Sequence, residues 1–186
     1  MMKEKHKAEL RKNVDIDIDV VRQAILDSSQ ESSVYVGCDS VVLDDEIAYV
    51  TVVIIHYDSN HGGKIYRDIQ FVYNHGNLRQ RLLYEAFLVS DIAYKVADVI
   101  GDRLFEIHLD INPNDKHKSN LVMKEAVGYV LGMVGFKPKL KPHAFAASGA
   151  SDHFAVAIRD NAERRKRNRK KRREWKRRQA KKAMGV

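Results

Sequence analysis

The chain carries the segment Val34-Tyr35-Val36-Gly37-Cys38-Asp39, in which β-forming residues run directly into an acid. Two further β-rich segments follow at 47–56 and 64–73, separated by short polar turns. This close spacing predicts an antiparallel meander of three strands. The middle segment is β-branched nearly throughout, which is typical of a strand buried on both faces.

The rest of the chain alternates between helix and strand patterns. We predict a long helix at about 77–100, a strand at 104–111, a helix at about 117–133, a short edge strand at 137–141 and a last helix from about 151. A crossover through the long helix places the fourth strand beside the first, in parallel. The predicted fold class is therefore α/β, with a mixed five-stranded sheet of order 3-2-1-4-5 flanked by helices.

The positive charge of the chain is concentrated at its C-terminal end. Of the 33 Lys and Arg and the 25 Asp and Glu, residues 161–186 hold 14 and 2, which gives this tail a net charge of +12. Residues 1–160 hold the other 19 and 23, a net charge of −4. We predict a charged N-terminal segment with a short helix at 1–30, a single domain at 31–160, and a basic tail at 161–186 that becomes helical on binding.

Several classes of protein do not fit this composition. No apolar run is long enough for a membrane span, and the charged N-terminus is not followed by the apolar region of a signal peptide. The single cysteine, Cys38, fits a reducing compartment. We therefore expect a cytoplasmic protein that does not bind membranes.

Four acids occupy positions where a plain fold would place apolar or neutral residues. Asp39 and Asp110 end two of the predicted strands, and the strand alternation lets both side chains point the same way. Glu85 lies within the apolar stripe of the long helix, and Asp152 opens the last helix after small residues that allow a close approach. His108 shares the face of Asp110 and could be an outer ligand or proton shuttle, or a structural residue. Four such carboxylates predict a bound cation, because burying an unpaired charge is costly. Their oxygens suit Mg²⁺ or Mn²⁺, which indicates metal-assisted chemistry on a phosphodiester.

Each of these features also has a plain structural interpretation. Glu85 could pair with Arg81, one helical turn before it, and Asp152 could simply favour a helix N-terminus. Lys118 could be a surface charge. The basic tail could serve solubility or act as a nuclear address.

Four motifs containing these acids resemble those of a known family. They are Val36-Gly37-Cys38-Asp39-Ser40, Arg81-Leu82-Leu83-Tyr84-Glu85, His108-Leu109-Asp110-Ile111-Asn112-Pro113 with Lys118-Ser119-Asn120, and Ala146-Ala147-Ser148-Gly149-Ala150-Ser151-Asp152. Together they make the chain similar to the YkuK family of predicted ribonuclease H-like proteins. Phe87 stands where family members often carry a further acid, and the basic tail lies outside the family pattern.

The resemblance implies a ribonuclease H-like fold and a metal-dependent endonuclease. Nucleases of this type use two divalent ions about 4 Å apart. The resemblance implies that Asp39 bridges both ions and that Asp110, Asp152 and Glu85 hold them individually. The implied cofactor is Mg²⁺ or Mn²⁺, and the implied substrate is RNA or DNA.

The acidic body would repel a polyanion, whereas the basic tail would attract one. Lys118 and Ser119 are candidates for contacts with substrate phosphates, and the tail is a candidate for binding by counterion release. The candidate tail residues are Arg164, Arg165, Lys166, Arg167, Arg169, Lys170, Lys171, Arg172, Arg173 and, by stacking on a base, Trp175. Two alternatives stay open: a non-catalytic nucleic-acid-binding protein that keeps the fold, and a ribosome- or RNA-associated protein that acts through its tail.

Overall fold

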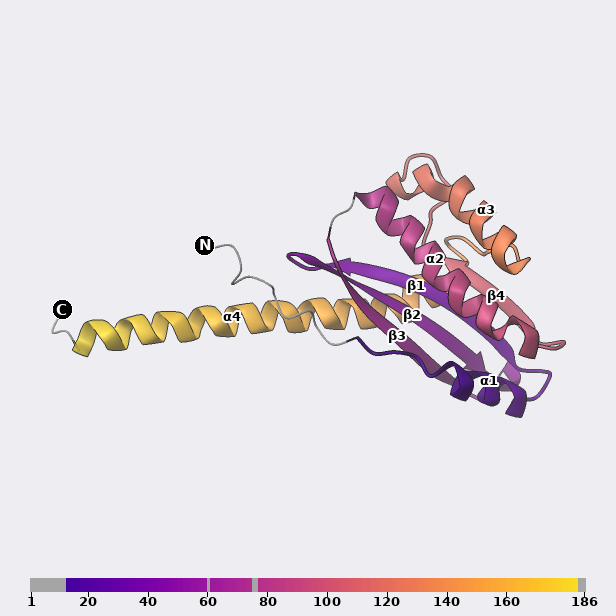
Figure 1. Cartoon of the computed structure of the whole chain (residues 1–186), viewed down its shortest axis with the longest axis horizontal. Coiled ribbons are helices and arrows are strands. Elements are labelled where there is room, and N and C mark those ends of the chain that lie inside the picture. The colour runs from indigo at the N-terminus through magenta and orange to yellow at the C-terminus, as the bar shows by residue number, and fades with distance from the viewer. Residues whose placement is uncertain (1–12, 60, 75–76, 184–186) are drawn as a thin grey trace, which may run out of the picture.

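The centre of the molecule is a four-stranded mixed sheet. The computed structural model describes residues 13–59, 61–74 and 77–183. The sheet has the order β3-β2-β1-β4 (Figure 1) and consists of β1 (Ser33–Val42), β2 (Glu46–His56), β3 (Gly63–Tyr73) and β4 (Leu104–Leu109). β2 is antiparallel to both of its neighbours, whereas β4 is parallel to β1. The predicted meander and the predicted place of the fourth strand are confirmed.

The predicted fifth strand is not confirmed, because the sheet in the described residues has four strands. Within the described residues, the segment at 137–141 contributes one isolated parallel bridge, between Lys139 and His108. Its backbone still follows β4, because Lys139 N–H donates to Ile107 O at 2.7 Å and Leu109 N–H donates to Lys139 O at 3.0 Å. Because Lys139 N–H is directed at β4, the nitrogen of the neighbouring Pro138 points to the open side of the segment, where an edge position needs no donor.

Helices cover the two faces of the sheet differently. One face packs on α2 (Leu78–Val96), which α1 (Ile18–Asp27) and α3 (Met123–Val134) flank. The other face packs on the π-helical segment η4 (Ala146–Ser151) and on the first turns of α4 (Asp152–Ala183). Short 3-10 turns complete the chain: η1 (Tyr57–Ser59), η2 (Ala97–Val99) and η3 (Lys118–Val122). Because both faces are covered, β2 is buried on both sides, as predicted.

The helix ends follow the local sequence. Asn77 caps α2 in a capping box with Gln80, and Asp17 caps α1 through the backbone N–H of Val20. Gly101 and Gly135 adopt φ angles of 62° and 80° after the helices that precede them, a conformation that glycine adopts at little cost. The Asp15–Asp19 acid cluster thus contains a capping residue.

The last helix belongs partly to the body and partly to the basic tail. Ala155 and Ala162 are buried against the sheet, and Ile158 packs beside them. Beyond these residues α4 leaves the body and continues without a break through the tail (Figure 1). The domain limits at 30 and 160, and the dependence of the tail helix on binding, stay predictions. No helix in the described ranges is long and apolar enough to cross a membrane.

Candidate carboxylate site

The parallel pairing of β1 and β4 brings two of the predicted acids together. Cys38 is the register partner of Leu109, so Asp39 and Asp110 come directly after a matched pair on neighbouring strands. Burial raises the pKa of Asp39 to about 7, and repulsion from the carboxylates of Asp110 and Asp152 adds to this. Three acids from β1, the end of β4 and the start of α4 therefore act on one another electrostatically.

Asp152 reaches this place because η4 lies directly against β1. A Cβ atom on Gly37 would stand only 2.5 Å from the backbone carbon of Ala146 and from the nitrogen of Ala147. No side chain fits in that space, so a glycine is required for the approach. The small residues before Asp152 predicted a close approach. The structure shows that the segment approached is β1, at Gly37.

His108 fixes the start of η4. Its ring is fully buried, and its Nδ1 accepts a hydrogen bond from Ala146 N–H at 3.0 Å. The proton therefore resides on Nε2, which donates to Glu106 Oε2 at 3.0 Å. Burial lowers the pKa of His108, which keeps the ring neutral and able to accept. Sequence reasoning considered His108 as an outer ligand or proton shuttle, and the structure gives it this positioning role.

Glu85 approaches the other acids from α2. Its side chain is buried and accepts a hydrogen bond from Ser40 Oγ at 2.5 Å. Burial raises the pKa of Glu85 to about 8, and Asp39 and Asp110 raise it further against the opposing effects of Ser40 and Arg81. The predicted ion pair with Arg81 is present at 4.0 Å, which is the outer limit for such a contact. The contact with Arg81 is therefore present, whereas metal binding by Glu85 stays a prediction.

Asp110 has a cationic neighbour that sequence reasoning missed. Lys141 Nζ lies 2.7 Å from Asp110 Oδ1, an ion pair that joins the edge segment to the end of β4. The same oxygen is buried and has no hydrogen bond of good geometry, so the ammonium is close to it without being aligned. Asp110 Oδ1 therefore remains an incompletely satisfied acceptor at the centre of the site.

The donor set suits a hard divalent cation by its chemistry. Asp39 is a half-buried and Glu85 a buried carboxylate; they repel each other and their acidic neighbours, and a divalent ion between them would relieve that repulsion. Within the described residues, however, no three Asp, Glu, His or Cys side chains are gathered as closely as a bound ion requires. The residues therefore match a hard divalent cation in the kind of ligand they offer, but their side chains are not gathered around one position.

The other predicted nucleic-acid contacts are exposed to different degrees. Lys118 is exposed and lines an open hollow of about 430 Å³ beside the start of α2. Ser119 Oγ accepts a hydrogen bond from Asn112 N–H at 3.1 Å, which ties down the loop after β4. The predicted tail residues from Arg164 to Trp175 are all exposed, and Lys166 forms an ion pair with Asp44.

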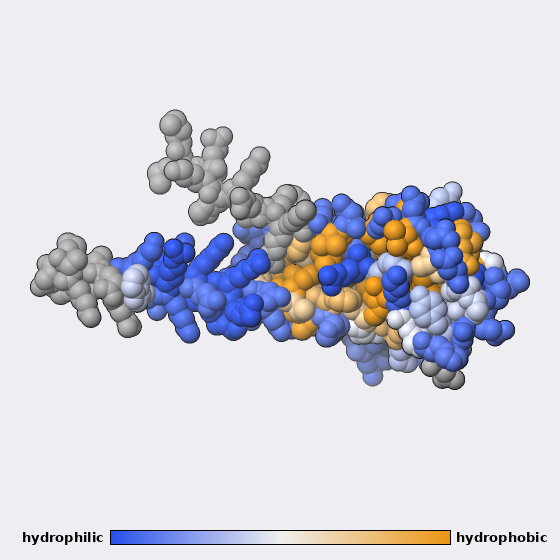
Figure 2. Space-filling model, turned by 90° about the horizontal axis from the view of Figure 1, so that it is seen from below, coloured by the Kyte–Doolittle hydropathy of each residue, from blue (hydrophilic) through white to orange (hydrophobic). Residues whose placement is uncertain are grey.

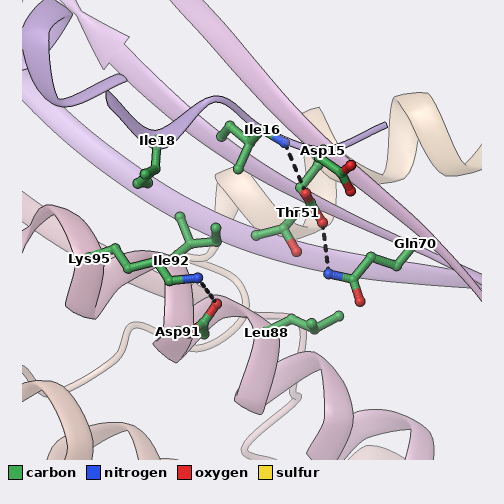
Figure 3. A pocket seen from close by; sticks show the side chains of 10 residues that line it. Asp15, Ile16, Ile18, Thr51, Gln70, Leu88, Asp91, Ile92 and Lys95 are labelled. Atoms are coloured by element: carbon green, nitrogen blue, oxygen red, sulfur yellow. Dashed lines mark hydrogen bonds and ion pairs between the residues drawn. The ribbon is translucent and has the colours of Figure 1, made fainter. Parts of the chain in front are cut away.

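A second hollow, of about 240 Å³, lies between the segment before α1, the β2–β3 pair and α2 (Figure 3). Several of its polar groups pair with one another. Asp68 accepts from Ile16 N–H and from Gln70, each at 3.0 Å, and Asp91 pairs with Lys95 at 2.6 Å. None of the four candidate acids lines it.

A family model described as Ribonuclease H-like matches residues 17–155, which is more than half of the chain. The chain belongs to the ribonuclease H-like family. This match covers all four candidate acids and ends within α4, so the basic tail lies outside the family region. No curated protein and no solved structure matches the chain. Membership of the ribonuclease H-like family indicates a nuclease-type or otherwise nucleic-acid-related function.

The raised pKa values predict that the metal-free protein loses stability as the pH rises. The folded-state pKa values of Asp39 and Glu85, about 7 and 8, lie above the values of 3.8 and 4.5 for free side chains. The folded state thus holds these protons more tightly, and its stability falls as the pH rises from about 5 to 8. In EDTA we expect the wild-type Tm to fall by roughly 5 °C or more over this range, relative to Asp39→Asn.

Thermal unfolding of both proteins across this pH range checks the prediction. Mg²⁺ or Mn²⁺ should restore the Tm of the wild type at pH 8 more than at pH 5, because the cation competes with the protons. Parallel Tm profiles for wild type and Asp39→Asn in EDTA would show that Asp39 carries no raised pKa.

Proposed function

We propose that this ribonuclease H-like protein is a metal-dependent nuclease that hydrolyses phosphodiester bonds in nucleic acid. The observation that carries the proposal is the convergence of Asp39, Asp110 and Asp152 from three separate elements, with Glu85 reaching them from α2. A fold needs no such cluster for stability, since each added carboxylate raises the electrostatic cost. Neighbouring carboxylates with raised pKa values are typical of a functional site.

The four acids would hold Mg²⁺ or Mn²⁺ in this proposal. When bound, the metal would lower the pKa of an attacking water and stabilise the charge on the leaving oxygen. Ser40 orients Glu85 through its hydrogen bond, and His108 holds η4 so that Asp152 stays beside β1. Lys118 offers an exposed ammonium to a substrate phosphate. The body contributes the reacting groups, and the basic tail contributes affinity for the polyanion.

Lys141 is expected to compete with the metal for Asp110. Its ammonium lies within ion-pair distance of a carboxylate that the proposal assigns to the cation. Replacing it in Lys141→Met should tighten Mn²⁺ binding roughly two- to fivefold, the scale of a partly exposed ion pair. Lys139→Met is the matched control, because that side chain is half-exposed and lies 3.8 Å from Glu106. Calorimetric titration with Mn²⁺ measures both, and weaker binding in Lys141→Met would contradict the role of Asp110.

The Lys141 contact also favours the second candidate function. A ribonuclease H-like protein in which Lys141 neutralises Asp110 permanently would bind nucleic acid without cutting it. Assays of the full chain on single-stranded, duplex and hybrid substrates, with Mg²⁺, Mn²⁺ or EDTA, separate the two. Metal-dependent cleavage supports the nuclease. Binding without cleavage under every condition supports the alternative.

A further inference from the structure

The basic tail of α4 has two unlike faces. With about 100° between successive residues, the side chains from Glu163 to Arg177 fall into two sectors around the helix axis. One sector, about 160° wide, contains cations alone: Arg165, Lys166, Arg169, Lys170, Arg172, Arg173, Lys176 and Arg177. We call it the cationic face. The remaining sector mixes Arg164, Arg167 and Lys171 with both acids of this stretch, Glu163 and Glu174, and with Asn168 and Trp175.

The cationic face continues the side of α4 that packs on the sheet. The centre of this face lies within about 30° of the direction in which Ala155, Ile158 and Ala162 meet the body. The ion pair between Lys166 and Asp44, in the turn after β1, shows this orientation directly. The cationic face therefore lies on the side of α4 that faces the body, and it continues along the projecting part of the helix.

We propose that the cationic face binds the major groove of duplex DNA. This inference rests on the proposed function and names its substrate class. An α-helix with its side chains is about 10–12 Å across, and the major groove of B-form DNA is about 12 Å wide. A helix seated there meets phosphates on both walls, which a cationic sector of about 160° can reach. The groove of duplex RNA is too narrow and deep for this seating.

The rest of the helix fits an outward position. The mixed sector carries both acids of the tail. It would face solvent, which keeps these acids away from the phosphates that would repel them. Figure 2 shows the projecting part of α4 as hydrophilic on the side in view, so no apolar strip competes for a protein partner there. Trp175, 60% exposed, belongs to the mixed sector, so this arrangement takes it out of the contact surface that sequence reasoning gave it.

Two matched triple variants test the face. The first replaces Arg165, Arg169 and Arg172 by Gln, and the second replaces Arg164, Arg167 and Lys171 by Gln. Both remove three charges from the full chain. Binding to a 20-base-pair DNA duplex is measured in EDTA over a range of salt, so the result does not depend on cleavage. Circular dichroism confirms that both keep their helix content.

The two variants should behave differently. The first should bind at least about tenfold more weakly, with a salt slope reduced by about 2.7, because three phosphate contacts are lost. The second should stay within about threefold of the wild type. Equal losses in both would overturn the proposal, because they would mean that net charge alone attracts the duplex. Tighter wild-type binding to single-stranded DNA or duplex RNA of equal length would overturn it as well.

Trp175 gives a second readout, since it is the single tryptophan of the chain. Its emission should stay unquenched when the duplex binds, because its ring faces away from the groove. Strong quenching would place the ring on the bases and refute the assignment of faces. A nuclease-dead protein that passes both tests would keep the DNA-binding face and lose the proposed reaction, so the two failures are distinguishable.

Discussion

Asp39→Asn is expected to reduce metal-dependent phosphodiester cleavage on the order of a thousandfold or more. The carboxylates of Asp110 and Asp152 both raise the pKa of Asp39, and Asp39 in turn raises that of Glu85, so Asp39 interacts with all three other acids. The substitution keeps the shape of the side chain and removes the charge that would hold the cation. Affinity for nucleic acid should stay constant or rise, because one negative charge leaves the body.

The matched control is Asp91→Asn, the same change at a position of α2 that lines the second hollow. Asp91 pairs with Lys95 at 2.6 Å and does not contribute to the pKa shifts of the four acids. Its variant should cleave at the wild-type rate. Single-turnover rates in Mg²⁺ and Mn²⁺ compare the two, with affinities measured in EDTA. Undiminished cleavage by both Asp39→Asn and Asp110→Asn would place the reaction elsewhere.

Gly37→Ala is expected to cost roughly 2–4 kcal/mol of folding stability and most of the cleavage activity. The added methyl group would meet backbone atoms of Ala146 and Ala147 at 2.5 Å, and backbone cannot turn aside as a flexible side chain can. Either β1 or η4 must move. A displaced η4 carries Asp152 away from Asp39, so activity should fall even where the protein is still folded.

Gly132→Ala provides the control for this substitution. Gly132 lies in α3, where an added Cβ atom meets nothing within 4 Å. The helix should gain about 0.5–1 kcal/mol, because alanine loses less backbone entropy than glycine. Urea unfolding measures both variants. A Gly37→Ala protein as stable as the wild type would show that η4 does not lie against β1 as tightly as described.

Periodicity predicted the parts of the site that depend on one strand or one helix. Alternation along residues 34–39 and 104–110 put Asp39 and Asp110 on corresponding positions, and helical phase put Glu85 toward the sheet. Asn77, Gly101 and Gly135 marked helix ends because capping chemistry is local. These features depend only on neighbouring residues, so the sequence is enough to find them.

Contacts between distant segments were beyond such reasoning. The sequence shows that Lys141 is basic, but its contact with Asp110 depends on how the edge segment runs beside β4. The segment at 137–141 was expected to be a short strand or extended segment at the edge, and within the described residues it forms one isolated bridge to β4. The close approach of small residues was expected, whereas their π-helical turn, with Ser151 Oγ donating to Ala146 O at 2.9 Å, was not.

Because α4 is unbroken, it holds the basic tail at a fixed distance and orientation from the body. If a flexible linker followed the body, a bound duplex could take many different positions relative to Asp152. A single helix from Asp152 to Ala183 instead fixes the spacing, with Arg169 on the cationic face about 26 Å along the helix from the acid at 1.5 Å per residue. The base pairs bound by the tail and the phosphodiester that is cut would then be a set number of base pairs apart. The fragments would therefore end at a defined distance from the bound stretch.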